Sequence, residues 1–255
     1  MPPSQKEQIR ALLKSIETGN PKPIAVVNEA KYIQHNPQTH EGSEGLAALF
    51  ARLAKTQPRV NMVRGFEDGV FVFAHMEYDF ASRKIGFEMF RFEEGQAVEH
   101  WDNIQERQGP NSAGHSMVDG PTEAEDLDHT EDNRACIRTF VETVLIKGEL
   151  DRLAEFIDET QYTEHNPRLD DDLATLHAAL DERDAQGART ISYERLHRVL
   201  AEGNFVLAAS EGRRGGVHSA FYDLFRLKGG KVVEHWDTTE KIAPKDQWKN
   251  NNGKF

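Results

Sequence analysis

The sequence predicts an α+β fold that occurs in two tandem copies. Residues 98–102, Val-Glu-His-Trp-Asp, return at residues 233–237. Each copy follows an aromatic-acidic run ending in Phe-Arg and a turn that contains glycine, a pattern typical of a β-hairpin. In both halves, helical spacing of apolar residues comes first and strand spacing follows. This order indicates separate helical and strand regions instead of alternating βαβ units.

The first half begins with predicted helices. Residues 4–29 carry apolar residues at helical spacing, and the Gly19-Asn20-Pro21 break divides them into two short helices. Residues 31–37 end in Asn36-Pro37, and the proline terminates any helix there. Residues 43–56 predict another helix with Ser43 as its N-cap.

From Val60 the apolar period falls to two. The Asp68-Gly69 pair predicts a tight turn between one strand and the next, which continues to Glu77. With the hairpin that contains residues 98–102, the first half therefore has about four strands.

The second half repeats this plan. Tyr-x-x-His-Asn-Pro occurs at residues 32–37 and 162–167, and Glu202-Gly203 corresponds to the Asp68-Gly69 turn. A helical pair surrounds Gly148, and leucines between residues 173 and 180 predict the next helix. The offset between copies grows by five residues, which fit into loops near 184–190 and 212–218. The pattern indicates tandem duplication.

The predicted domains are residues 1–120 and 121–255, each of ordinary domain size. The linker from about residue 105 to residue 128 is rich in Gly, Pro, Ser and acidic residues. Residues 110–118 resemble the C-terminal residues 249–255, so each domain is expected to end in a polar arm. A plain linker and a frayed tail are the alternative.

The composition excludes several classes of protein. Of 255 residues, 43 are acidic and 31 basic, giving a net charge of −12, and the chain has no basic cluster suited to nucleic acid. Cys136 is the single cysteine, so no internal disulfide can form. The sequence shows neither a signal peptide nor an apolar run long enough to span a membrane. We therefore expect a soluble, cytoplasmic protein.

Both halves resemble the SnoaL-like proteins of the nuclear transport factor 2-like superfamily, over residues 5–106 and 132–241. The resemblance rests on Tyr-x-x-His-Asn-Pro, the Asp/Glu-Gly turn, and acid-x-Phe-Arg followed by Val-Glu-His-Trp-Asp. It implies two cone-shaped α+β barrels, each with about three helices packed on a curved, mostly antiparallel sheet around a pocket. Characterised members include polyketide cyclases that catalyse aldol condensation without metal or organic cofactor, and non-catalytic members also exist. The family is commonly dimeric, which implies an intramolecular pseudo-dimer here and also allows a homo-oligomer.

Strand alternation divides the repeated pentapeptide between two faces. Val98, His100 and Asp102 are predicted to share one face, and Glu99 and Trp101 the other, with the same division in the second copy. If the first face lines the pocket, a carboxylate and an imidazole can act as acid and base beside a carbonyl group. The predicted catalytic residues are Asp102, His100, Asp237 and His235. Alternatively, these side chains only complete the hydrogen bonding of the strand.

Further polar residues are candidates for substrate binding, because the resembled fold places them near the pocket. They are Tyr32, His35, Asn36, His75, Tyr162, His165 and Asn166. The His-Asn pairs could equally fix the proline turn, and the tyrosines could belong to the core. The apolar pocket lining is predicted to include Phe71, Phe73, Met89, Phe205 and Leu224.

His75 is the main difference between the copies, because Ala209 occupies its place in the second. If only one module is active, this favours the first. Three histidines and a carboxylate could bind zinc, but their scattered spacing argues against a metal. The predicted function is cofactor-independent acid-base chemistry of the aldol-condensation, cyclase or isomerase type on a small apolar or carbonyl-containing molecule. The alternative is a non-catalytic ligand-binding or assembly protein.

Overall fold

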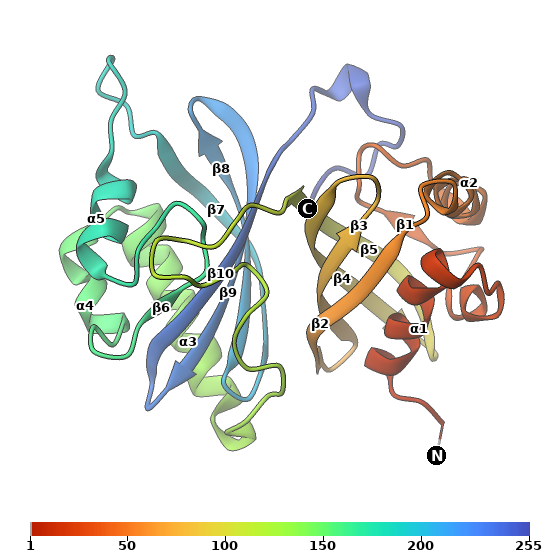
Figure 1. Cartoon of the computed structure of the whole chain (residues 1–255), viewed down its shortest axis with the longest axis horizontal. Coiled ribbons are helices and arrows are strands. Elements are labelled where there is room, and N and C mark those ends of the chain that lie inside the picture. The colour runs from red at the N-terminus through yellow and green to blue at the C-terminus, as the bar shows by residue number, and fades with distance from the viewer. Residues whose placement is uncertain (1) are drawn as a thin grey trace. The chain divides into compact units, whose positions relative to one another are not determined.

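The computed structural model describes residues 2–255, except for the side chains of Ser43 and Glu44. The chain forms two compact units (Figure 1). Unit 1 comprises Met1–Arg107 together with Ile242–Phe255, and unit 2 comprises Gln108–Lys241. Each unit holds one five-stranded sheet with its helices, so the predicted α+β class and its duplication are confirmed.

Unit 1 places its helices before its long strands. Its elements are α1 (Gln5–Thr18), the 3₁₀ helix η1 (Lys22–Val26), β1 (Ile33–Gln34), α2 (Gly42–Ala54), β2 (Arg59–Asp68), β3 (Phe71–Asp79), β4 (Arg83–Glu93), β5 (Gln96–Glu106) and, in the C-terminal tail, η5 (Lys245–Gln247). The sheet order is β1-β5-β4-β3-β2, and only β1 pairs in parallel. Helix α1 starts at a capping box between Ser4 and Glu7 and ends at Gly19, whose φ of 67° suits glycine.

Unit 2 repeats the order and the pairing. Its elements are η2 (Leu127–His129), α3 (Thr130–Phe140), the π-helical turn η3 (Val141–Ile146), η4 (Leu150–Arg152), α4 (Leu153–Phe156), β6 (Thr163–Glu164), α5 (Leu173–Asp181), β7 (Ile191–Glu202), β8 (Phe205–Arg214), β9 (Val217–Lys228) and β10 (Lys231–Lys241). The sheet order is β6-β10-β9-β8-β7. The extra residues of this copy lie where they were expected, before β7 and in the longer β8–β9 hairpin.

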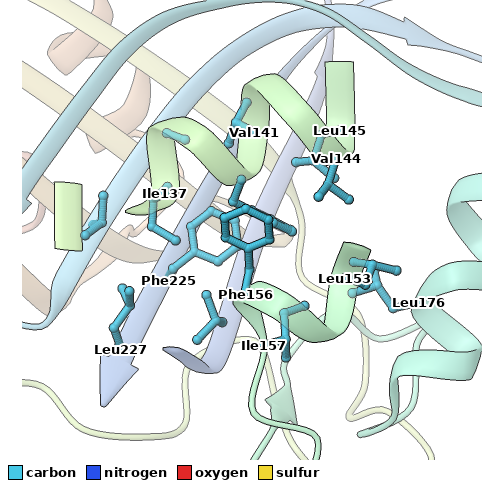
Figure 2. Packing of buried hydrophobic residues seen from close by; sticks show 14 of the residues in the cluster. Ile137, Val141, Val144, Leu145, Leu153, Phe156, Ile157, Leu176, Phe225 and Leu227 are labelled. Carbon is cyan, nitrogen blue, oxygen red and sulfur yellow. The ribbon is translucent and has the colours of Figure 1, made fainter. Parts of the chain in front are cut away.

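The core of unit 2 lies between the helices and one face of the sheet. Figure 2 shows Ile137 and Val144 of the α3–η3 helix, Phe156 of α4 and Phe225 of β9 packed together. The Phe140 and Phe225 rings meet edge to face with centroids 5.6 Å apart. This packing fixes the helices over the sheet face that also carries the pocket residues.

A β-bulge interrupts the predicted alternation in both copies of the repeated pentapeptide. On β5, Ala97 pairs with Phe92 and Glu99 pairs with Arg91, so Val98 is the extra residue. On β10, the same shift falls at Val233. Ala97 and Val232, not the valines that follow them, therefore enter the helix-side cores. The prediction that Val98 shares the face of His100 was wrong, because the bulge adds one residue to the alternation.

Two other details differ from the sequence predictions. Helix α2 begins at Gly42 with Glu41 in the N-cap position, so Ser43 falls inside the first turn, and its side chain lies outside the described residues. The 108–120 segment, expected as the arm of the first domain, packs in unit 2, and the C-terminal tail packs in unit 1. Among the described residues, no helix is long and apolar enough to cross a membrane.

Candidate active sites in the two units

Unit 2 contains a cavity of about 430 Å³ between α5 and the sheet. Its apolar lining includes Leu169, Leu176, Leu180 and Phe221. Its polar lining comes mainly from four adjacent strands and from the Asn166-Pro167 turn, and includes Asn166, Arg168, Tyr193, Arg214, Asp223, His235 and Asp237. An apolar cavity with a few converging polar groups is the usual form of a small-molecule site.

His235 lies between two carboxylates at the floor of this cavity. Its Nδ1 is 3.0 Å from Glu164 Oε2, and its Nε2 is 3.1 Å from Asp223 Oδ1. Burial lowers the pKa of His235, but the two carboxylates outweigh burial and hold that pKa well above its usual range. His235 is therefore an imidazolium, and both of its N–H groups are already engaged.

Asp237 lies on β10 two residues after His235, and it lines the same cavity. The Asn166 side-chain amide donates to its two carboxyl oxygens at 3.0 Å. Burial raises the pKa of Asp237 to about 6, and the nearby carboxylates of Glu164 and Asp223 act in the same direction. A carboxyl group with such a pKa exchanges protons readily near neutral pH, as a general acid or base must.

Two tyrosines complete the polar floor of unit 2. The Tyr193 hydroxyl is 3.2 Å from both carboxyl oxygens of Asp223, and the Tyr162 hydroxyl donates to Glu164 Oε2 at 2.5 Å. Burial and the neighbouring carboxylates raise the pKa of each tyrosine well above 10. Both therefore remain neutral hydrogen-bond donors.

Unit 1 has a smaller cavity, of about 200 Å³, at the corresponding place. His100 bonds there to Gln34 Oε1 through Nδ1 (3.0 Å) and to Glu88 Oε2 through Nε2 (2.7 Å). The same Gln34 oxygen accepts the backbone N–H of Asn36, which identifies it as the oxygen. His100 therefore donates from Nδ1 to the neutral amide of Gln34. In unit 2, the corresponding nitrogen of His235 contacts the carboxylate of Glu164 instead.

Asp102 differs from Asp237 in the charge beside it. The Lys254 ammonium, carried by the C-terminal tail, is 3.3 Å from Asp102 Oδ1, and the Asn36 amide donates to Oδ2 at 2.6 Å. Burial raises the pKa of Asp102, but Lys254, His100 and Asn36 outweigh burial and bring it below its ordinary value. Asp102 is thus a stable carboxylate and a weaker base than Asp237.

Glu88, His100 and Asp102 offer ligand atoms that all lie within 4.8 Å of one another, so they are the residues that could hold a metal ion. Tyr78 already donates to Glu88, which also contacts His100 Nε2, and Asn36 and Lys254 donate to Asp102. A cation would have to displace the Lys254 ammonium. The donor set therefore fits an organic hydrogen-bond network better than a metal.

The structure separates the predicted substrate-binding residues into two groups. Asn36, Asn166 and Tyr32 line the cavities, and Tyr162 lines a separate cavity of about 30 Å³ that also contacts Asp223 and His235. The histidines of the His-Asn pairs lie on the opposite face, where they stack on the repeated tryptophans. The ring centroids are 4.7 Å apart for His35–Trp101 and 4.6 Å apart for His165–Trp236.

These stacked histidines belong to a structural network. His35 Nε2 is 2.9 Å from Glu99 Oε1, while Arg91 donates to the other oxygen of Glu99 at 2.6 Å. His165, Glu234 and Arg226 repeat the arrangement with the same distances. The network fixes the proline turn to the hairpin, and that position keeps the histidines out of both cavities.

His75 also lies away from the cavity. Its Nδ1 is 2.7 Å from Arg64 Nη1, and its ring packs edge-on against Phe87 on the face of the sheet opposite the helices. Because alternate residues of β3 point to opposite faces, Phe71 and Phe73 are on that face as well, and Met89, Phe205 and Leu224 likewise do not line either cavity. His75 therefore gives no reason to favour the first module.

Sequence reasoning missed several residues of the two sites. The missed cavity residues are Gln34, Tyr78 and Glu88 in unit 1, and Arg168, Tyr193, Arg214 and Asp223 in unit 2. Glu164, which bonds to His235 behind the unit 2 cavity, was missed as well. One signal was present, because Glu88 and Asp223 are the acidic members of the repeated run before Phe-Arg. In the hairpin register they lie directly opposite Asp102 and Asp237. Their position opposite Asp102 and Asp237 depends on the strand register of each hairpin, which includes the β-bulge and was not predicted from the sequence.

No protein-family model matches the sequence, and no curated protein matches it. Solved structures similar to this chain include nuclear transport factor 2-like proteins, polyketide cyclases and ketosteroid isomerase-like proteins. A nuclear transport factor 2-like protein from Burkholderia xenovorans is 17% identical, with 48% of this chain and 97% of that chain covered and a TM-score of 0.37. IdmH, a candidate polyketide cyclase from Streptomyces antibioticus, is 15% identical, with 40% of this chain and 93% of that chain covered and a TM-score of 0.36. An epoxide hydrolase from M. tuberculosis is 15% identical, with 44% of this chain and 85% of that chain covered and a TM-score of 0.34.

Proposed function

We propose that unit 2 is an enzyme that removes a proton next to a carbonyl group of a small apolar molecule, with Asp237 as the general base. The observation that carries this proposal is the carboxyl group of Asp237, which lines an apolar cavity and has a pKa of about 6. A base with this pKa is mostly ionised at neutral pH and still holds a proton long enough to return it.

The neighbouring groups support this chemistry. The carboxylate of Asp237 takes the proton from carbon, and the electron pair of that C–H bond passes to the carbonyl oxygen. The fixed positive charge of His235 favours the resulting enolate. In an isomerisation, Asp237 then returns its proton to a different carbon. In a cyclisation, the enolate carbon attacks a second carbonyl, whose π electrons pass to its oxygen, and Asp237 gives its proton to the resulting alkoxide. His235 acts here as a positioning residue, because both of its ring nitrogens are held by carboxylates.

For unit 1, the Lys254–Asp102 ion pair favours the alternative of a ligand-binding or structural role. The Lys254 side chain is 2% exposed and that of Asp102 is 6% exposed, so the pair is almost fully withdrawn from water. A carboxylate stabilised in this way gives up its negative charge reluctantly and is a poor proton acceptor.

Hydrogen-deuterium exchange at carbon tests the proposal with small carbonyl compounds as probes. The full chain is incubated in D₂O with a panel of small ketones and oxo acids, and proton NMR follows loss of the signals next to each carbonyl. We expect protein-dependent exchange for at least one compound. Asp237→Asn should slow that exchange by about 100-fold or more, because general-base catalysis contributes at least this much.

The duplicated chain provides a matched control. Asp102→Asn changes the corresponding residue of unit 1 and should leave the exchange rate within about twofold of the unmodified protein, a change well below the contribution of a general base. Exchange that no member of the panel shows, or that persists unchanged in Asp237→Asn, would refute the assignment of Asp237.

A further inference from the structure

Two arginines line the unit 2 cavity beside the acids. Arg214 is the last residue of β8, and Arg168 follows the Asn166-Pro167 turn. Among the carboxylates whose side chains the structure describes, none forms an ion pair with either guanidinium, whereas Arg226 of the same unit bonds to Glu234 at 2.6 Å. The cavity therefore contains two positive charges that the fold itself leaves unneutralised by a salt bridge.

This arrangement is electrostatically costly in the absence of a ligand. Arg214 is half-buried, and burial and the positive charge of Arg168 lower its pKa, outweighing the opposite effect of the Asp237 carboxylate. Two like charges lining one apolar cavity repel each other more strongly than they would in water. An anion placed between them would replace this repulsion with two attractions. Guanidinium groups also bind carboxylates through paired N–H donors.

The first copy shows that the fold does not need these arginines. Counting from the repeated Asn-Pro, the residue matching Arg168 is Gln38, and counting from the repeated Asp/Glu-Gly turn, the residue matching Arg214 is Phe80. Gln38 and Phe80 line the unit 1 cavity. The same two wall positions are thus uncharged in one unit and cationic in the other, which indicates a ligand preference specific to unit 2.

We propose that the unit 2 cavity selects a carbonyl compound that carries a carboxylate on an apolar body, with the carboxylate bound by Arg168 and Arg214. This inference rests on the proposed function for the reacting carbon, and it adds the substrate class. The leucines at 169, 176 and 180 and Phe221 pack the apolar body. Glu182 is the other acid of the lining besides Asp223 and Asp237, and it accepts a hydrogen bond from the Thr190 hydroxyl at 2.7 Å.

A pair of probes of equal shape tests the charge preference. Binding of 2-naphthoate and of neutral 2-naphthamide to the full chain is measured by titration calorimetry at pH 7. We expect the carboxylate to bind at least about tenfold more tightly, which corresponds to one charge-assisted hydrogen bond. The double variant Arg168→Gln/Arg214→Gln should lose this preference while its affinity for the amide remains. Arg168→Gln alone should lose part of it.

Arg213→Gln is the matched control, because Arg213 is an exposed neighbour that pairs with Glu194 at 3.0 Å and does not line the cavity. It should keep the full preference, and thermal unfolding of each variant verifies its fold. Equal binding of the two probes, or an unchanged preference in the double variant, would overturn the substrate class. Carboxylate selectivity without any exchange at carbon would refute only the proposed reaction, and exchange confined to neutral ketones would refute only this inference.

Discussion

Replacement of Asp237 by asparagine should stabilise the protein at high pH. A carboxyl group whose pKa rises on folding binds its proton more tightly in the folded state, so its favourable contribution is complete below the unfolded pKa and is lost as the pH rises through the folded pKa. For Asp237 these limits are about 3.8 and about 6. The difference of about two pKa units corresponds to roughly 3 kcal/mol at most, and water that reaches the cavity reduces this toward 1 kcal/mol.

Asparagine keeps the shape of the side chain without the charge. The free energy of unfolding of Asp237→Asn should therefore exceed that of the unmodified chain at pH 8, and the advantage should shrink by about half when the pH is lowered to 5. Urea unfolding followed by circular dichroism at the two pH values measures this difference.

The matched variant Asp102→Asn should behave in the opposite way. It leaves the buried ammonium of Lys254 without its carboxylate, so it should destabilise the protein at pH 7 and above. A variant Asp237→Asn that is less stable than the unmodified chain at pH 8, or a stability gain that does not change with pH, would refute the electrostatic reasoning.

Three further outcomes follow from the same structure. The rate of proton exchange at carbon should rise with pH through about 6, as Asp237 ionises to the basic form, and a flat profile from pH 5 to 8 would contradict this. Lys254→Met should cost about 3 kcal/mol of unfolding free energy at pH 7, measured by urea unfolding, because it isolates the buried carboxylate of Asp102. Gly69→Ala should cost about 1 kcal/mol for its positive φ alone. Gly203→Ala should cost more unfolding free energy than Gly69→Ala, because its Cβ would also meet a backbone carbonyl oxygen. Equal losses of unfolding free energy in the two variants would contradict this.

The duplicated architecture was accessible from the sequence because its signals are local. Helical and strand periods, the Asp/Glu-Gly turns and the repeated hairpin each depend on neighbouring residues, and they predicted every long strand of both sheets. The short parallel strands β1 and β6 were not predicted, since two residues carry no period and their partners are about 66 and 71 positions away.

The site was only partly accessible for a similar reason. Alternation along β5 and β10 put His100 on one face with Asp102, and His235 on one face with Asp237, and the structure shows that both pairs line cavities. It could not show that Lys254, distant in the chain, lies against Asp102, nor that Glu164 replaces Gln34 beside the histidine. Those two neighbours set the charge of each site, so the difference between the two units had to come from tertiary contacts.

The C-terminal tail has a consequence for biosynthesis. Unit 1 includes Ile242–Phe255, whose contacts with the first module join residues more than 150 positions apart, among them Lys254–Asp102 and Gly253–His35. Unit 2 is continuous in sequence, from Gln108 to Lys241. Since a ribosome releases the chain from its N-terminus, the first part of unit 1 must wait for Ile242–Phe255 to be synthesised before its packing is complete. Completion of unit 1 therefore depends on residues that are synthesised after the whole of unit 2.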